Sequence, residues 1–173
     1  LEYKYLPVKD TPAGQVTAAF RQVLSFIELR REIMGKTEII LTGIKKTNNY
    51  YEMSFGYRYN GLKVYYKDSK GRIASPLVIK ANSERVLECR WVIRSITEVE
   101  KPKNYSIYFA DLINKEIPAL YPEIIQREKK YFERIEPGYI FDSDKQDNLS
   151  ITPNWIISTD ADDYFIPLSE EGG

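Results

Sequence analysis

The chain lacks histidine altogether and has one cysteine, Cys89, among its 173 residues. Without histidine it cannot assemble a Ser-His-Asp or Cys-His catalytic group, or a metal site with histidine ligands. With one cysteine it cannot form an internal disulfide. Because Cys89 lies within an alternating apolar pattern, we expect an inert core residue rather than a nucleophile.

Long apolar runs and an excess of one charge are also missing. No apolar stretch approaches the roughly 18 residues that cross a bilayer, and no signal-peptide pattern is visible. The chain begins with Leu1 rather than methionine, so we expect a piece of a longer protein. Its 25 basic and 25 acidic residues cancel, which argues against binding to nucleic acid or to an anionic membrane surface.

Tyrosine, in contrast, is abundant, with 14 residues. Tyrosine covers half-buried sheet surfaces well, and it is also enriched at protein interfaces. The sequence leaves both interpretations open. P-loop, dinucleotide-binding, Cys-x-x-Cys and G-x-S-x-G motifs are absent, so no cofactor and no standard catalytic centre is predicted.

Residues 12–34 carry the pattern of an amphipathic helix, preceded by a short strand over 1–6. Thr11 is expected to cap the helix and Pro12 to occupy its first position. Gly35 follows as the expected stop. The apolar residues recur at the i, i+3, i+4, i+7 spacing of one helix face: Val16, Ala19, Phe20, Val23, Leu24 and Ile27.

A β-hairpin is predicted around Asn60-Gly61, the preferred dipeptide of a two-residue type I′ turn. Its first strand, 51–59, alternates apolar and polar residues. The turn sets the register of the pairs on both faces. The expected pairs are Tyr59 with Leu62, Tyr57 with Val64, Phe55 with Tyr66, Arg58 with Lys63 and Gly56 with Tyr65. A strand over 37–44 precedes the hairpin, and its Gly43 is expected to mark a bulge.

A second hairpin is predicted over residues 77–93, with a three-residue loop at 83–85. This loop length pairs the apolar residues of the two strands. It sets Ile79 opposite Cys89, Leu77 opposite Trp91 and Lys80 opposite Glu88. The last pair joins opposite charges across the strands, which favours this register.

Lys101-Pro102-Lys103-Asn104 interrupts the pattern and is the expected boundary between two domains, 1–100 and 101–173. A helix over 106–117 follows, and Pro118 and Pro122 should end it. Strand formers occur in 124–135, and short strands are expected at 139–141, 155–158 and 164–168. We therefore predict an α+β fold, a helix packed on a strongly twisted antiparallel sheet, in two similar halves.

Two acidic groups are candidates for chemistry. Asp142, Asp144 and Asp147 suggest a calcium loop, but glycine and the bidentate glutamate of an EF-hand are missing from their positions. Asp160, Asp162 and Asp163 lie between two predicted strands, as turn residues do. Paired carboxylates could serve a hydrolase, but no pair is predicted to converge, so we predict neither a metal site nor catalytic residues.

One surface is a candidate for binding a partner. The outer face of the first hairpin brings together Arg58, Lys63, Tyr65 and Lys67. A solvated charged face is the simpler interpretation. Arginine and tyrosine are enriched among the energetically dominant residues of interfaces, so this group is also the predicted partner surface.

Several short segments follow one another in a distinctive order. They are a strand at 1–6, a helix with Thr17-Ala18-Ala19-Phe20, Gly43, the strand 51–59 with Asn60-Gly61-Leu62, the hairpin from Val78-Ile79 to Arg94, Pro153-x-Trp155-x-Ile157-x-Thr159, and Tyr164-Phe165-Ile166. This order resembles the extracytoplasmic region of the YycH/YycI regulators of Gram-positive bacteria, and also domains of the PepSY and cystatin type. The cystatin Gln-x-Val-x-Gly loop is absent.

The resemblance implies a regulator without catalytic residues of its own. The whole protein would be anchored to the cell membrane by an N-terminal helix, and its outer domain would bind a sensor histidine kinase and a related regulator. Such a regulator acts by binding one kinase conformation better than another. The alternative is a PepSY- or cystatin-like domain that binds a peptide or a small ligand and acts on a protease.

Overall fold

A computed structural model describes residues 2–4, 12–93, 96, 105, 108–122, 132–142, 151, 153–160 and 162–168. The chain divides into two compact units. Unit 1 comprises Leu1–Tyr66 and Ala74–Thr97, and unit 2 comprises Lys67–Ile73 and Glu98–Gly173. Both units combine antiparallel strands with short helical segments, so the α+β class is confirmed. The predicted boundary at 101–104 lies outside the described residues.

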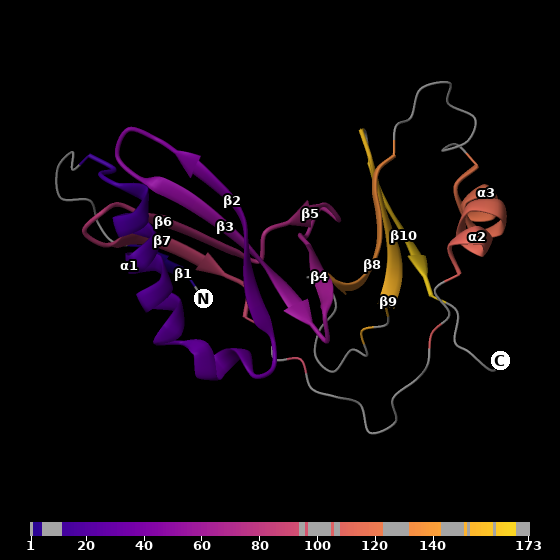
Figure 1. Ribbon diagram of the computed structural model, residues 1–173, viewed down its shortest axis with the longest axis horizontal. Helices are drawn as coiled ribbons and strands as arrows, with labels where there is room; N and C mark the ends of the chain where they lie inside the picture. Colours follow the sequence, from indigo (N-terminus) through magenta and orange to yellow (C-terminus); the bar gives the residue numbers. More distant parts are fainter. Residues whose placement is uncertain are drawn as a thin grey trace. The chain divides into compact units, whose positions relative to one another are not determined.

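Unit 1 is an antiparallel sheet in the order β1-β7-β6-β3-β2 (Figure 1). A single long helix, α1, precedes the sheet's main strands, and a 3-10 turn at Arg31–Met34 follows it. The bounds are β1 Glu2–Lys4, α1 Val16–Glu28, β2 Glu38–Lys46, β3 Tyr51–Tyr59, β4 Leu62–Lys67, β5 Ile73–Ala74, β6 Leu77–Ala81 and β7 Val86–Trp91.

Helix α1 begins at Val16, later than predicted. The backbone before it bonds elsewhere: the Ala13 amide donates to Asn48, and the Ala13 carbonyl accepts from Ser83. Gly14 follows with a positive φ of 69°. These tertiary bonds hold the segment out of the helix, and Thr11 lies outside the described residues. The predicted cap and first turn are therefore wrong.

The first hairpin has the predicted register at its turn. Tyr59 pairs with Leu62, Tyr57 with Val64 and Arg58 with Lys63. Asn60 and Gly61 both have positive φ, as a type I′ turn requires. The predicted pair of Phe55 with Tyr66 is wrong, because Phe55 pairs with Leu77 of β6 instead. Strand β3 therefore exchanges one partner strand for another along its length.

Two further register predictions are confirmed. In the second hairpin Leu77 pairs with Trp91, Ile79 with Cys89 and Lys80 with Glu88. The Lys80 ammonium lies 3.0 Å from the Glu88 carboxylate. In β2 the register shifts between Leu41 and Gly43, where the bulge was expected.

The core of unit 1 lies on one face of its sheet. Alternate residues of β3 are buried, and the partners of β6 and β7 are buried with them. Helix α1 contacts β6 and β7 and buries Ala19 and Val23. Other buried residues of this core include Met34, Met53, Phe55, Tyr57, Leu77, Ile79, Cys89 and Trp91.

Unit 2 contains the antiparallel strands β8 (Phe132–Asp142), β9 (Pro153–Thr159) and β10 (Asp163–Pro167), with β9 in the middle. All seven residues of β9 are buried. One helical segment packs against the sheet through Leu112 and Ile117. It consists of α2 (Phe109–Asp111), a π-helical turn (Leu112–Glu116) and α3 (Ile117–Leu120). The three strands expected in this region are present.

Pro118 does not end this helical segment, contrary to the prediction. The helix continues to Leu120, and Pro118 occupies the start of α3, directly after the π-helical turn. The wider π-helical turn reduces the clash between the proline ring and the carbonyl of the preceding turn. Proline has no backbone N–H, and at this position the helix does not need one for its hydrogen bonds.

Candidate protein-binding surfaces

The four residues of the predicted partner surface have different surroundings. Arg58 and Lys63 are cross-strand partners at the tip of the first hairpin. The Arg58 guanidinium also lies 3.8 Å from the Glu38 carboxylate of β2. The structure therefore brings these two cations together and gives one of them an acidic neighbour.

The other two residues do not lie on an open charged face. Tyr65, expected on the outer side opposite Gly56, is 7% exposed, so the expectation that it belongs to an exposed surface is wrong. The Lys67 ammonium lies 3.9 Å from the centre of the Phe165 ring within unit 2, at the range of a cation–π interaction. Whether the group binds a partner stays a prediction.

A different apolar surface is present on the helix-covered face of the unit 1 sheet. Leu41 pairs with the buried Phe55, and Ile44 pairs with the buried Met53, so both side chains point to the core face. They are nevertheless 42% and 47% exposed. The reason is the position of α1, which lies over β6 and β7 rather than over β2.

Helix α1 adds apolar side chains beside this strand. Phe26 of α1 contacts Tyr3 of β1, with 5.8 Å between ring centres, so this flank of the helix faces the β1 edge. Viewed down the helix axis, Phe26 lies to one side of the buried Val23, and Phe20 and Leu24 lie to the other side. Phe20 and Leu24 are therefore on the opposite flank of the helix. That flank therefore points along the sheet in the direction of β3 and β2, and Leu24 is 46% exposed. We call Val16, Phe20, Leu24, Leu41 and Ile44 the α1–β2 surface.

Strand β2 is the outermost strand on its side of unit 1 (Figure 1). Within the described part of the chain it pairs with β3 alone. Its outer backbone groups can therefore accept an added strand. Charges mark its ends: Glu38 lies at the start, and Lys45 and Lys46 lie at the end.

Sequence reasoning missed the α1–β2 surface. The pattern gave Val16, Phe20 and Leu24 as one face of an amphipathic helix and residues 37–44 as a strand, without indicating that any of these side chains stays exposed. Only the position of α1 over the sheet reveals which of them stay uncovered. The apolar character of the strand at 37–44 was the one feature of the sequence that could have indicated this surface.

The acidic groups do not form a site in the described residues. Asp160, Asp162 and Asp163 are exposed at the turn between β9 and β10. The Asp163 carboxylate accepts a 2.6 Å hydrogen bond from Ser158, and the Asp162 backbone bonds with Thr159. Asp144 and Asp147 lie outside the described residues. No group of three metal-ligating side chains occurs among the residues described.

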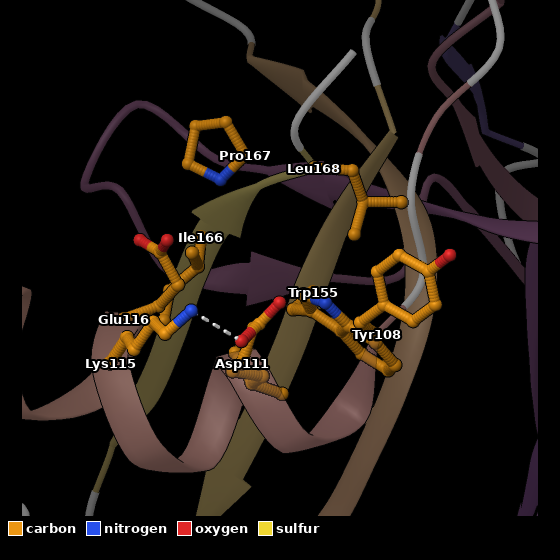
Figure 2. A pocket seen from close by; sticks show the side chains of 9 residues that line it. Tyr108, Asp111, Lys115, Glu116, Trp155, Ile166, Pro167 and Leu168 are labelled. Atoms are coloured by element: carbon orange, nitrogen blue, oxygen red, sulfur yellow. Dashed lines mark ion pairs between the residues drawn. The ribbon is translucent and has the colours of Figure 1, made fainter. Parts of the chain in front are cut away.

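Unit 2 contains a small pocket of about 150 Å³ between its helical segment and the end of β10 (Figure 2). Apolar side chains form part of its wall, and charged side chains form its rim. Phe109 packs edge-on against Trp155, with 6.1 Å between ring centres, and so supports the aromatic wall. The pocket is lined by Tyr108, Asp111, Leu112, Lys115, Glu116, Trp155, Ile166, Pro167 and Leu168.

Charged groups from one helical segment form the rim of this pocket. The Lys115 ammonium lies 2.8 Å from the Asp111 carboxylate, and Figure 2 shows the two side chains pointing toward one another. The hydrogen bond and the charge of Asp111 raise the pKa of Lys115, so its ammonium stays charged. Glu116 adds a second carboxylate. The rim therefore carries two negative charges and one positive charge.

Comparison with known proteins does not identify the chain. We found no protein family, no characterised protein and no solved structure that matches it. Among the described helices, none combines the length and the apolar character needed to cross a membrane.

Proposed function

We propose that the chain is a non-catalytic, extracytoplasmic protein-binding domain that regulates a membrane sensor histidine kinase, together with a related regulator. The kinase and the compartment come from the resemblance to the YycH/YycI regulators. The observation that supports protein binding is the α1–β2 surface, an exposed apolar area next to an open strand edge.

The occupant of this surface is an extended segment of the partner that pairs with β2. Its backbone would use the free edge of β2, and apolar side chains at alternate positions would cover Leu41 and Ile44. Covering the exposed half of each side chain would contribute on the order of 1 kcal/mol. Acidic residues opposite Lys45 and Lys46 would fix the direction of the added strand.

The proposal predicts a sensor kinase gene beside that of the chain, and the experiment measures the affinity of the chain for the purified outer domain of that kinase. Leu41→Thr combined with Ile44→Thr removes apolar area from β2 but keeps residues that favour strands. We expect this variant to raise the Kd by about tenfold or more, as loss of an interface anchor does.

The matched control is Leu29→Thr, because Leu29 is 84% exposed and lies at the end of α1 on the side away from the sheet. This variant should bind like the unchanged chain. Equal affinity of the unchanged chain and the Leu41→Thr/Ile44→Thr variant, with both folded, contradicts the β2 assignment.

A second candidate is a PepSY- or cystatin-like domain that binds a peptide or a small ligand and acts on a protease. The pocket of unit 2 is the observation that favours it. Calorimetry with a panel of short peptides distinguishes the two candidates. Tight binding of free peptides, without affinity for a kinase domain, would favour the second.

The proposal extends to a likeness between the two halves and to a strong twist of the sheet. In each unit a helical segment packs on an antiparallel sheet, and residues 37–66 and 131–168 would be counterparts. An experimental structure tests this directly. Different strand directions in the two ranges after superposition would exclude an internal duplication.

A further inference from the structure

We propose that the pocket of unit 2 receives a lysine or arginine side chain presented by a partner protein. The inference rests on the proposed function, because it names a kind of residue that a bound protein would carry. It concerns unit 2 alone and is independent of the α1–β2 surface. Three properties of the pocket support it: its size, its wall and its rim.

The size of the pocket suits one extended side chain. At about 30 Å³ per water, a volume of about 150 Å³ holds about five water molecules. A lysine side chain has a similar number of heavy atoms beyond its Cα. A whole drug-sized ligand would need several times this volume.

The wall of the pocket suits an apolar stem that ends in a cation. Trp155, Leu112 and Ile166 are buried and provide apolar contacts for methylene groups. Tyr108 is exposed at the mouth. Aromatic rings attract cations through their electron-rich faces, so Tyr108 and Trp155 favour an ammonium or guanidinium over a neutral group.

The rim decides the sign of the ligand charge. Lys115 neutralises Asp111 across 2.8 Å, and Glu116 leaves the rim with a net negative charge. A bound cation lies near both carboxylates and adds to the existing ion pair. An anion would meet Lys115 but would also be repelled by both carboxylates.

The experiment follows the two indole N–H signals of the ¹⁵N-labelled chain by NMR. The chain has two tryptophans, so Trp155 reports on the pocket and Trp91, buried in unit 1, serves as an internal reference. The probes are the N-acetyl amides of lysine, arginine, norleucine and glutamate. Lysine and arginine should shift the Trp155 signal saturably, norleucine and glutamate much less, and Trp91 should not move.

Two isosteric variants test the rim. Glu116→Gln and Asp111→Asn should each weaken binding of the lysine amide by about two- to fivefold, the size of one partly screened charge interaction. The control is Glu32→Gln, an exposed residue of unit 1, which should leave binding unchanged. An unmoved Trp91 signal shows that unit 1 of each variant is folded, and a Trp155 signal at its unchanged position shows the same for unit 2.

Several outcomes would overturn the inference. They are equal binding of norleucine and lysine, stronger binding of glutamate, or no shift of Trp155 with any probe. Because these titrations contain no partner protein, their failure leaves the β2 proposal standing. Conversely, if the kinase-domain assay contradicts the β2 proposal, the results of the amino acid titrations still stand.

Discussion

The indole Nε1 of Trp91 donates a 2.7 Å hydrogen bond to the Tyr57 hydroxyl, and that hydroxyl donates to the Val92 carbonyl at 2.7 Å. Both side chains are buried. The bonds link β3 to the end of β7 across the intervening strand β6. A buried polar group without a partner is costly, so this chain of bonds lets two large polar aromatic side chains occupy the core.

Tyr57→Phe should therefore destabilise unit 1 by about 1–3 kcal/mol, because it leaves the Trp91 N–H and the Val92 carbonyl without their partner. Urea unfolding followed by tryptophan fluorescence measures the change. Tyr3→Phe is the matched control, since Tyr3 is partly exposed on β1, and it should change stability by less than about 0.5 kcal/mol. Equal effects of the two substitutions would show that the hydrogen-bond chain contributes nothing.

The same tyrosine should make unit 1 sensitive to alkali. Burial disfavours the phenolate and raises the pKa of Tyr57 above its ordinary value of 10.0. Above pH 10 the folded state then holds a proton that the unfolded state loses. The contribution to stability is complete below pH 10 and is lost as the pH rises toward the folded pKa. Between about pH 9 and pH 11, the unchanged chain should lose more stability than Tyr57→Phe in urea titrations.

The sequence predicts the registers of the two hairpins well. It predicts less well which distant parts of the chain pack against the residues of those hairpins. Asn60-Gly61 sets three pairs, and the apposition of Lys80 and Glu88 sets the second hairpin, because both depend on residues close in sequence. Phe55 departs from its predicted partner because β6, from a distant part of the chain, competes for the same edge. The start of α1 depends likewise on tertiary bonds of Ala13.

The candidate surface was less predictable than the fold. Leu41 and Ile44 face the core side of the sheet only because of the bulge between Leu41 and Gly43, and no local pattern shows that α1 leaves them uncovered. The predicted partner group depended on an outward Tyr65, which is buried. Whether such a side chain is exposed depends on where elements distant in the sequence pack. Local sequence patterns do not show where those elements pack.

Gly14→Ala should destabilise unit 1 by about 1–3 kcal/mol. Gly14 has a φ of 69°, which side chains disfavour, and an added Cβ would collide with the Ser83 side chain. Gly43→Ala is the matched control, because an added Cβ there meets open space and the backbone is not left-handed. We expect it to change the free energy of unfolding by less than about 0.5 kcal/mol. A reversed order of the two effects would contradict the conformation of Gly14.

Asp68 should give unit 2 an acid-dependent stability. Its carboxylate accepts hydrogen bonds from the Arg72 and Lys70 amides and from the Arg72 guanidinium, and the Arg72 amide contributes most to lowering the pKa of Asp68 below 3.8. The stabilisation is present above pH 3.8 and is lost as the pH falls through the lower folded pKa.

Asp68→Asn keeps an oxygen acceptor but removes the charge. The Tm of this variant should therefore change less than that of the unchanged chain between about pH 4 and pH 2. Asp160→Asn, in the exposed turn between β9 and β10, is the control and should leave the pH dependence unaltered. If Asp68→Asn also follows the original curve, the loop carboxylate has no part in acid unfolding.

Cys89 should be unreactive while unit 1 is folded. The thiol is fully buried, and burial raises its pKa to about 11, so access and the small thiolate fraction both suppress its reaction with a disulfide reagent. At about pH 8, the native chain should react only at the rate at which unit 1 opens, and urea should expose one thiol per chain. A Leu29→Cys variant supplies the comparison, since position 29 is exposed and its thiol should react at once. If both thiols of the native variant react equally fast, Cys89 is accessible to the reagent. Strand β7 would then pack less tightly against the rest of the core than the burial of Cys89 indicates.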